Sequence, residues 1–274
     1  MERTLIVVSY YDGRTIKYLK SLLKSMKEYS AGSAYDLCIV VNSTSEKKIK
    51  INPKVANVIY HENIGMNIGA WDYGWRMNPN YRDYLFLQDE CYVVKNNWLS
   101  SFQRIFKESN VGMVGESINE KWNKDWEKLH NEQQSIKMRE HELDGELANR
   151  VDVYLNFMRR NKIDPGRNGR HLRSLVWYLD RVTLEKIGGF PIGTNYGECI
   201  ASEIAVSKSV EETGKTIVQV SDEAFKYIRH LEWNKCPNSS HYRHDSLYQE
   251  LNNGKLSKLN ALLITIRNYF HRII

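Results

Sequence analysis

Long apolar runs are missing from this sequence of 274 residues, and its four cysteines lie far apart without a C-x-x-C pair. No apolar segment reaches the roughly 20 residues of a membrane-spanning helix, which argues against an integral membrane protein. The N-terminus lacks the basic start, apolar middle and small-residue cleavage site of a secretory signal. The cysteine spacing gives little support to zinc or thiol-redox motifs. We therefore expect a cytoplasmic protein with reduced thiols.

Charge of one sign does not dominate either. There are 39 Lys and Arg against 33 Asp and Glu, a formal net charge of +6, and 42% of the residues are hydrophobic. This balance is typical of a globular protein with an ample core and excludes a disordered chain. The basic excess gathers at one end, because 251–274 holds four basic residues and no acid. That asymmetry argues against a general nucleic-acid binder, which needs a basic stripe.

The first third of the chain alternates apolar runs with an amphipathic pattern. The runs, each typical of a strand buried on both faces, cover 4–8, 37–41, 57–60 and 84–87. Apolar residues recur at helical spacing from Ile16 to Tyr29, with lysines between them. This alternation predicts a Rossmann-like α/β fold with a mainly parallel, open sheet flanked by helices. Because ligands bind beyond the carboxyl ends of such strands, 9–12, 42–45 and 88–90 should converge on one cleft.

A glycine-rich segment, 61–74, follows the third predicted strand. It holds three glycines, Gly65, Gly69 and Gly74, which allow close approach of the backbone to a ligand or a neighbouring helix. Asn63 and Asn67 supply amide groups. The spacing does not match a dinucleotide-binding fingerprint, and no Gly-Lys-Ser/Thr follows as in a Walker loop. Tight helix packing would explain the glycines but not the paired asparagines.

Two adjacent acids, Asp89 and Glu90, follow Gln88 at the end of an apolar strand. Such acids are costly to bury unpaired. They suit hard oxygen ligands for Mg²⁺ or Mn²⁺, and the metal would in turn bridge a diphosphate and neutralise its charge. A solvated turn is the alternative interpretation of this segment taken alone.

Two other regions depart from the α/β alternation. In 116–170, apolar residues from Trp122 to Leu147 follow a three/four spacing, which predicts a helix or helical pair that either packs on the main domain or forms an acceptor-side lid. The tail repeats apolar residues from Leu256 to Ile273 at helical spacing. This basic amphipathic helix fits an anionic membrane surface, docking on the protein's own core or a dimer contact.

Several short motifs follow one another along the chain. They are Ser9-Tyr10-Tyr11-Asp12-Gly13, Asn42-Ser43-Thr44-Ser45, Asn63-x-Gly65, Gln88-Asp89-Glu90, Gly188-Gly189-Phe190 and Ser202-Glu203. In this order they resemble the motifs of the GT-A glycosyltransferases, most closely the inverting family-2 group. The resemblance covers about 4–115 and 175–232. It implies a GT-A domain over 1–250, with 116–170 as a helical insertion and 251–274 as the C-terminal amphipathic helix.

The same resemblance implies an activity. A sugar would pass, with inversion, from a nucleotide-diphosphate sugar, with a UDP-sugar as the first expectation, to a hydroxyl of a glycan or lipid-linked glycan. The implied setting is bacterial-type surface polysaccharide synthesis on the cytoplasmic face of the membrane, where the tail at 255–274 would make peripheral contact. A divalent metal, Mg²⁺ or Mn²⁺, is the implied cofactor, and a homo-oligomer is a further expectation.

Site residues follow from the resemblance as well. Glu203 is the implied general base, with Glu198 as its substitute; the alternative for Glu203 is an acid that favours a helix start. The implied metal ligands are Asp89, Glu90 and His230. The implied donor-binding residues are Ser9, Tyr10, Tyr11, Asn42, Asn63, Gly65, Asn67, Gln88, Asp89 and Arg229.

The sequence departs from the family pattern at Gln88, which replaces the first acid of a metal-binding D-x-D motif, and at Glu203, which stands where the family has two acids. A non-catalytic relative that binds a nucleotide sugar or a glycan is therefore an open alternative. A sugar nucleotidyltransferase is a second one, although the first strand lacks the glycine-rich, basic loop that such enzymes carry at its exit.

Overall fold

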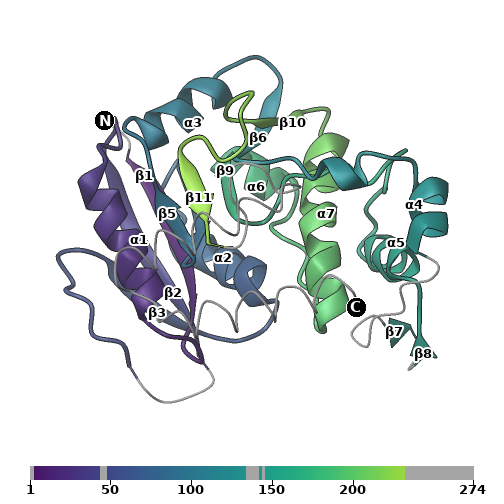
Figure 1. The fold of residues 1–274 in the computed structure, drawn as a ribbon, viewed down its shortest axis with the longest axis horizontal. Helices are drawn as coiled ribbons and strands as arrows, with labels where there is room; N and C mark the ends of the chain where they lie inside the picture. The colour runs from purple at the N-terminus through teal and green to yellow at the C-terminus, as the bar shows by residue number, and fades with distance from the viewer. Residues whose placement is uncertain (1–2, 44–47, 134–141, 144–145, 232–274) are drawn as a thin grey trace, which may run out of the picture.

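The structure is a computed structural model and describes residues 3–43, 48–133, 142–143 and 146–231. Its centre is a seven-stranded sheet with the strand order β10-β6-β9-β4-β1-β2-β3 (Figure 1). The strands of this sheet are β1 (Thr4–Tyr11), β2 (Tyr35–Ser43), β3 (Asn57–Glu62), β4 (Asp83–Gln88), β6 (Val111–Gly115), β9 (Val176–Asp180) and β10 (Thr216–Gln219). Two small antiparallel pairs accompany it, β5 (Cys91–Val93) with β11 (Ile228–His230), and β7 (Glu142–Leu143) with β8 (Glu146–Leu147).

Helices cover both faces of the sheet. They are α1 (Lys17–Glu28), α2 (Met66–Arg76), α3 (Trp98–Phe106), α4 (Trp126–Gln133), α5 (Arg150–Arg160), α6 (Arg181–Lys186) and α7 (Tyr196–Glu212), with a short 3₁₀ turn at Glu120–Trp122. One apolar core joins α1 and α3 to the sheet, and a second joins α2, α6 and α7 to its other face. A third cluster packs α4 and α5 against α7. The molecule therefore has the three-layer α/β architecture that the alternating pattern predicts.

Strand β1 lies between β2 and β4 and is parallel to both. Its register places Tyr11 opposite Asn42 and Ser9 opposite Gln88. The predicted convergence of the polar strand exits is confirmed for these residues. Thr44 and Ser45 lie outside the described residues. Strand β9 runs antiparallel between β4 and β6, so the sheet is mixed but mainly parallel.

The described residues of 116–170 are helical only in part. Where the three/four spacing predicts a helix or helical pair from Trp122 to Leu147, the structure has α4, the β7–β8 pair and then α5 from Arg150. Residues 134–141 and 144–145 lie outside the described residues. The sequence between β7 and β8 is Asp-Gly, a dipeptide typical of two-residue hairpin turns, which competes with the helical spacing as a signal.

Among the described residues, none of the helices combines the length and the hydrophobicity needed to cross a bilayer. The amphipathic tail predicted over 251–274 lies outside the described residues. Its interpretations as a membrane-surface, self-docking or dimer helix therefore stay predictions.

The start of α2 depends on two glycines. Gly65 adopts the left-handed conformation with φ of 71°, and a Cβ on Gly69 would lie 1.9 Å from the carbonyl oxygen of Ile64. The glycines thus let the turn after β3 fold tightly onto the first turn of the helix.

We expect Gly69→Ala to lower the free energy of unfolding by about 1–3 kcal/mol, because the methyl group must displace backbone. This sign opposes helix propensity, by which alanine is favoured over glycine by roughly 1 kcal/mol in an exposed helix interior. Urea denaturation followed by circular dichroism measures the difference. A variant as stable as the wild type would contradict the close approach.

Candidate active site

The exit of β1 presents an aromatic ring at the carboxyl edge of the sheet. Tyr11 is half-buried, and a Cβ on Gly13 would lie 2.5 Å from its ring. Because Gly13 has no side chain, the Tyr11 ring can lie against the turn at this position. Ser9 and Tyr10 are buried, with 4% and 3% of their surfaces exposed, and the hydroxyl of Ser9 donates to the carbonyl oxygen of Leu87. Of these strand-exit residues, Tyr11 is the one with surface left for a ligand.

The side chain of Asn42 is engaged at both ends. Its Nδ2 donates to the carbonyl oxygen of Met66 at 2.7 Å, and its Oδ1 lies 3.0 Å from Nδ1 of His61. Its backbone carbonyl accepts from the N–H of Asp12 at 3.1 Å. Asn42 thus holds the exits of β1 and β3 and the start of α2 together, which leaves its amide little capacity for a nucleotide.

The two asparagines of the glycine-rich segment have different surroundings. Asn63 is exposed, whereas Asn67 is half-buried and donates from Nδ2 to the carbonyl oxygen of Ser174 at 2.9 Å. Gly65 is buried, and a Cβ there would meet Ile192 at 2.5 Å. The segment therefore presents Asn63 to solvent and uses Asn67 to hold the chain before β9.

Gln88 makes two hydrogen bonds that explain why an amide stands in this position. Its Nε2 donates to the carbonyl oxygen of Ser174 at 2.6 Å, and its Oε1 lies 3.2 Å from Nε2 of His230. A carboxylate could not donate to a carbonyl oxygen. Burial lowers the pKa of His230 to about 3, with a further contribution from the nearby Arg14 charge, so the ring is neutral. The network assigns its proton to Nε2.

Glu203 lies in the middle of α7, which begins at Tyr196, so the alternative interpretation of Glu203 as a helix-start acid is wrong. Its Oε1 accepts from the backbone N–H of Ser174, and its Oε2 lies 4.0 Å from Nε2 of the buried His171. Burial raises the pKa of Glu203, while the Ser174 hydrogen bond and the charge of Arg173 oppose this. The Glu203 side chain is 16% exposed.

Ser174 joins these groups. Its carbonyl oxygen accepts from Asn67 and Gln88, and its N–H donates to Glu203. The acidic exit of β4 and the candidate base on α7 are therefore two hydrogen bonds apart, although 115 residues separate Gln88 from Glu203 in the sequence.

The two acids after β4 have different environments. Asp89 is 5% exposed and its Oδ2 has no hydrogen-bond partner among the described residues, while burial and the neighbouring Glu90 raise its pKa to about 7. Glu90 forms an ion pair with Arg14, and its Oε2 lies 3.7 Å from Nε2 of His230. Because burial keeps that histidine neutral, the approach of His230 is not an ion pair.

These residues form an incomplete metal site. The unpartnered Oδ2 of Asp89 and the carboxylate of Glu90 are the hard oxygen ligands that Mg²⁺ and Mn²⁺ prefer. However, within the described part of the chain no three His, Cys, Asp or Glu side chains gather as a metal-holding group. His230 directs a protonated nitrogen at Gln88 rather than a lone pair. On their own these two acids would hold a cation weakly, and oxygens from a ligand such as a diphosphate would complete its coordination.

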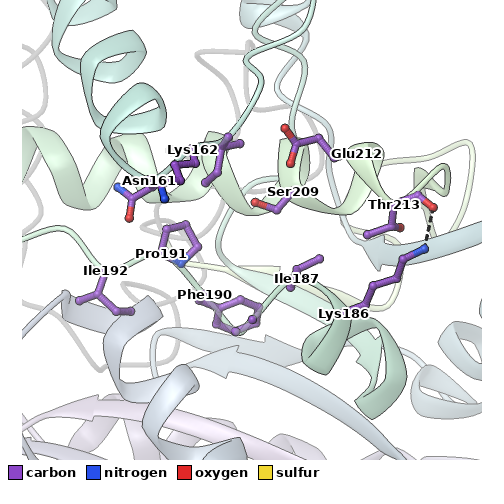
Figure 2. Close-up of a pocket in the computed structure, with 13 residues that line it drawn as sticks. Asn161, Lys162, Lys186, Ile187, Phe190, Pro191, Ile192, Ser209, Glu212 and Thr213 are labelled. Carbon is purple, nitrogen blue, oxygen red and sulfur yellow. Dashed lines mark hydrogen bonds between the residues drawn. The ribbon is translucent and has the colours of Figure 1, made fainter.

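A cavity of about 560 Å³ lies elsewhere, between the C-terminal ends of α5, α6 and α7 (Figure 2). Lys186 donates from Nζ to the carbonyl oxygen of Thr213 at 3.0 Å along its edge. The Gly188-Gly189-Phe190 turn lines it, but none of the catalytic, donor-binding or metal residues predicted from the sequence does. The Gly188-Gly189-Phe190 turn therefore lines this cavity and not the strand exits.

Solved structures with the same architecture identify the fold. A mannosyltransferase from Pyrobaculum calidifontis, PcManGT, in complex with GDP-Man and Mn²⁺, aligns with a TM-score of 0.52 and 12% identity over 97% of this chain. GalNAc-T7 with UDP, GalNAc and Mn²⁺ aligns with a TM-score of 0.50 and 10% identity over 79% of it. This chain has the GT-A fold of glycosyltransferases. It spans 64% and 42% of the lengths of those two chains.

No family model and no curated protein matches the sequence. The GT-A fold that the motifs predict is confirmed by shape, while roles of single residues are not tested by it. At 10–12% identity, the likeness establishes how the chain folds and not what it does.

Several predicted site residues have structural partners in this GT-A fold. Glu198 accepts from the N–H and the hydroxyl of Thr194 at 2.9 and 2.8 Å and pairs with Arg160, which lowers its pKa against the effect of burial. These contacts anchor the start of α7. Trp71 and Trp177 are fully buried core residues. Arg229 is half-buried and donates to the carbonyl oxygen of Phe225 at 3.4 Å.

Sequence reasoning missed three participants: Arg14, Ser174 and Glu116. Arg14 directly follows the first motif, Ser9 to Gly13, and a basic residue at that place was a usable signal. Ser174 acts through its backbone, which no residue pattern reveals. Glu116 follows β6 at the same edge of the sheet and accepts from the N–H groups of Tyr227 and Ile228 at 3.2 and 2.7 Å, so it holds the segment that leads to His230.

Glu116 provides a pH test of this edge. Burial raises its pKa from 4.5 to about 8, and its Oε2 has no hydrogen-bond partner in the part of the chain that the structure describes. Between these values the folded state binds more protons than the unfolded state, so this group makes stability fall as pH rises. Glu116→Gln keeps an acceptor and removes the ionisation. Relative to the wild type, the variant should gain stability between about pH 5 and pH 8 and no more above that range.

Urea denaturation at several pH values measures this difference. Glu120→Gln, at an exposed glutamate nearby, is the control and should follow the wild-type pH dependence. A difference between Glu116→Gln and the wild type that stays constant with pH would contradict a buried, neutral Glu116.

Proposed function

We propose that this chain is a glycosyltransferase that moves a sugar from a nucleotide-diphosphate sugar to a hydroxyl group. The observation that carries the proposal is the convergence, on a GT-A fold, of the acidic exit of β4 with Glu203 through the shared contacts of Ser174. The acids after β4 suit a cation that binds a diphosphate, and Glu203 suits deprotonation of an acceptor hydroxyl. The bound GDP-Man and UDP of the two similar structures support a nucleotide-sugar donor.

Glu203 is the proposed general base. It would take the proton of the acceptor hydroxyl while the oxygen attacks the anomeric carbon and the bond from that carbon to the diphosphate oxygen breaks. The pKa of its carboxyl is raised by burial, which moves it toward the working pH of a base. The N–H of Ser174 fixes Oε1, and Oε2 lies 4.0 Å from Nε2 of His171. A single displacement of this kind inverts the anomeric carbon.

The donor is proposed to lie over the exits of β1 and β4. Tyr11 offers a partly exposed ring for stacking and Asn63 an exposed amide, while Asp89 and Glu90 would hold a divalent cation together with the diphosphate. When bound, that cation would neutralise charge on the leaving diphosphate. The Mn²⁺ in both similar structures supports this expectation.

The family-2 motifs support the finer parts of the proposal. They favour inversion, a glycan or lipid-linked glycan as acceptor, a UDP-sugar as the first donor to try, and a role in bacterial-type surface polysaccharide synthesis. No contact within the described residues bears on the acceptor.

Glu203→Gln should reduce kcat by at least about 100-fold, the usual contribution of a general base, and change nucleoside-diphosphate affinity less than about threefold. Release of nucleoside diphosphate from a panel of UDP- and GDP-sugars measures the first quantity, and calorimetry the second. Glu211→Gln, further along the same helix where the carboxylate pairs with Lys208 at 2.9 Å, is the matched control and should keep wild-type turnover. Full activity of Glu203→Gln would remove this residue from the mechanism.

A wild-type chain that binds nucleotide sugars but releases no diphosphate would instead favour the non-catalytic alternative. Gln88 and the single acid at Glu203 are the observations behind that second candidate.

Nucleotide binding is tested by thermal denaturation with UDP, GDP and their sugars, with Mn²⁺ or EDTA. A ligand of the folded state at 100 times its Kd stabilises by about 2.7 kcal/mol, which raises Tm by several degrees. We expect at least one nucleoside diphosphate to do so with Mn²⁺, and the matching nucleoside to do so less. The absence of any shift across the panel would contradict the proposed function.

A further inference from the structure

Arg14 lies beside Asp89 and Glu90, the two acids of the predicted cation site. It stands in the turn between β1 and α1, held there by its own N–H donating to the carbonyl oxygen of Tyr11 and by its carbonyl accepting from the hydroxyl of Tyr10. From this turn its guanidinium forms an ion pair with Glu90. The side chain of Arg14 is 52% exposed and that of Glu90 15%, so the pair is open to solvent on the arginine side.

The charge of Arg14 affects the whole cluster. It lowers the pKa of Asp89 against the larger effect of burial, and it contributes to the lowered pKa of His230. The titratable groups that face it from the turn between β4 and β5 and from β11 are thus two acids and one neutral histidine. Within the described residues, Arg14 is the cation that pairs with Glu90 and lowers the pKa of Asp89.

A divalent cation and the Arg14 guanidinium cannot both bind the carboxylate of Glu90 at contact distance without a loss of binding free energy. Two cations of this kind repel each other at contact distance. A solvent-exposed ion pair contributes little free energy, so Arg14 can leave Glu90 when a better partner arrives. The planar guanidinium, with its five N–H donors, binds phosphate oxygens in a bidentate manner. A diphosphate placed at this edge would therefore attract Arg14 away from the carboxylate.

We infer that Arg14 is an internal counter-ion that occupies Glu90 in the nucleotide-free protein and transfers to the diphosphate when the donor binds. This inference rests on the proposed function for its second step. In the free protein Arg14 competes with divalent metal for Glu90. When a nucleoside diphosphate binds, Arg14 contacts its phosphates, and Glu90 becomes available to a cation that the same diphosphate helps to hold. Metal and nucleotide binding are then positively coupled through this one side chain.

The test compares Mn²⁺ affinity in the wild type and in Arg14→Gln, by calorimetry or by the electron paramagnetic resonance signal of free Mn²⁺, without nucleotide. Removing the competing cation should tighten Mn²⁺ binding by about two- to fivefold, the range that an exposed ion pair supplies. Arg3→Gln is the matched control, because Arg3 makes a similar exposed ion pair with Asp36 at the opposite edge of the sheet. Its Mn²⁺ affinity should equal that of the wild type. Glu90→Gln in the Arg14→Gln background should reverse the gain.

Equal Mn²⁺ affinity in the wild type and Arg14→Gln would overturn the inference, and so would an equal gain in Arg3→Gln. A second arm adds UDP or GDP. The nucleotide should tighten Mn²⁺ binding in the wild type by a larger factor than in Arg14→Gln, and an equal factor would also contradict the inference. If neither nucleotide binds any of the proteins, the proposed function fails, while the nucleotide-free arm still decides whether Arg14 competes with metal.

Discussion

The backbone of Ser174 is the point on which the candidate site depends. Its carbonyl oxygen accepts from the amides of Asn67 and Gln88, and its N–H donates to Glu203. These three side chains come from α2, β4 and α7, which lie far apart in the sequence. This junction ties the exit of β4 to the carboxylate on α7 through two hydrogen bonds. The chemistry proposed here requires that the distance between them be held.

Gln88 has a second consequence for the charge of the site. An acid in its place would add a third carboxylate beside Asp89 and Glu90, and it could not donate to Ser174. The amide instead keeps a neutral His230 oriented and leaves two acids, one of which is neutralised in part by its raised pKa and the other by Arg14. The local charge is therefore close to balanced before any ligand arrives. A site of this kind suits a cation that comes with its diphosphate better than a cation held by protein alone.

Much of the fold could be predicted from the sequence because buried parallel strands are short continuous apolar runs. The four runs of the first third are found in β1, β2, β3 and β4, and the polar strand exits meet where strand order requires. Local competition limited the prediction elsewhere. The β7–β8 pair stands before α5 where the spacing predicts helix, and α7 begins seven residues before Glu203 because Asn195 caps it.

Roles of single residues were harder to predict, for a physical reason. The sequence shows that Asn42 and Gln88 are polar residues at strand ends, but not that their amides are consumed by Met66, His61, Ser174 and His230. Burial and pairing also differ between neighbours such as Asp89 and Glu90, which no pattern distinguishes. Arg14 could not be connected with Glu90, 76 residues later, before the strand order was known.

The central claim is that a nucleoside diphosphate binds at the exits of β1 and β4. A crystal structure with UDP or GDP, whichever the protein binds more tightly, tests it most directly. The account predicts the base beside Tyr11 and the diphosphate within contact of Arg14 and the acids after β4. A nucleotide seated instead in the cavity between the ends of α5, α6 and α7 would contradict it.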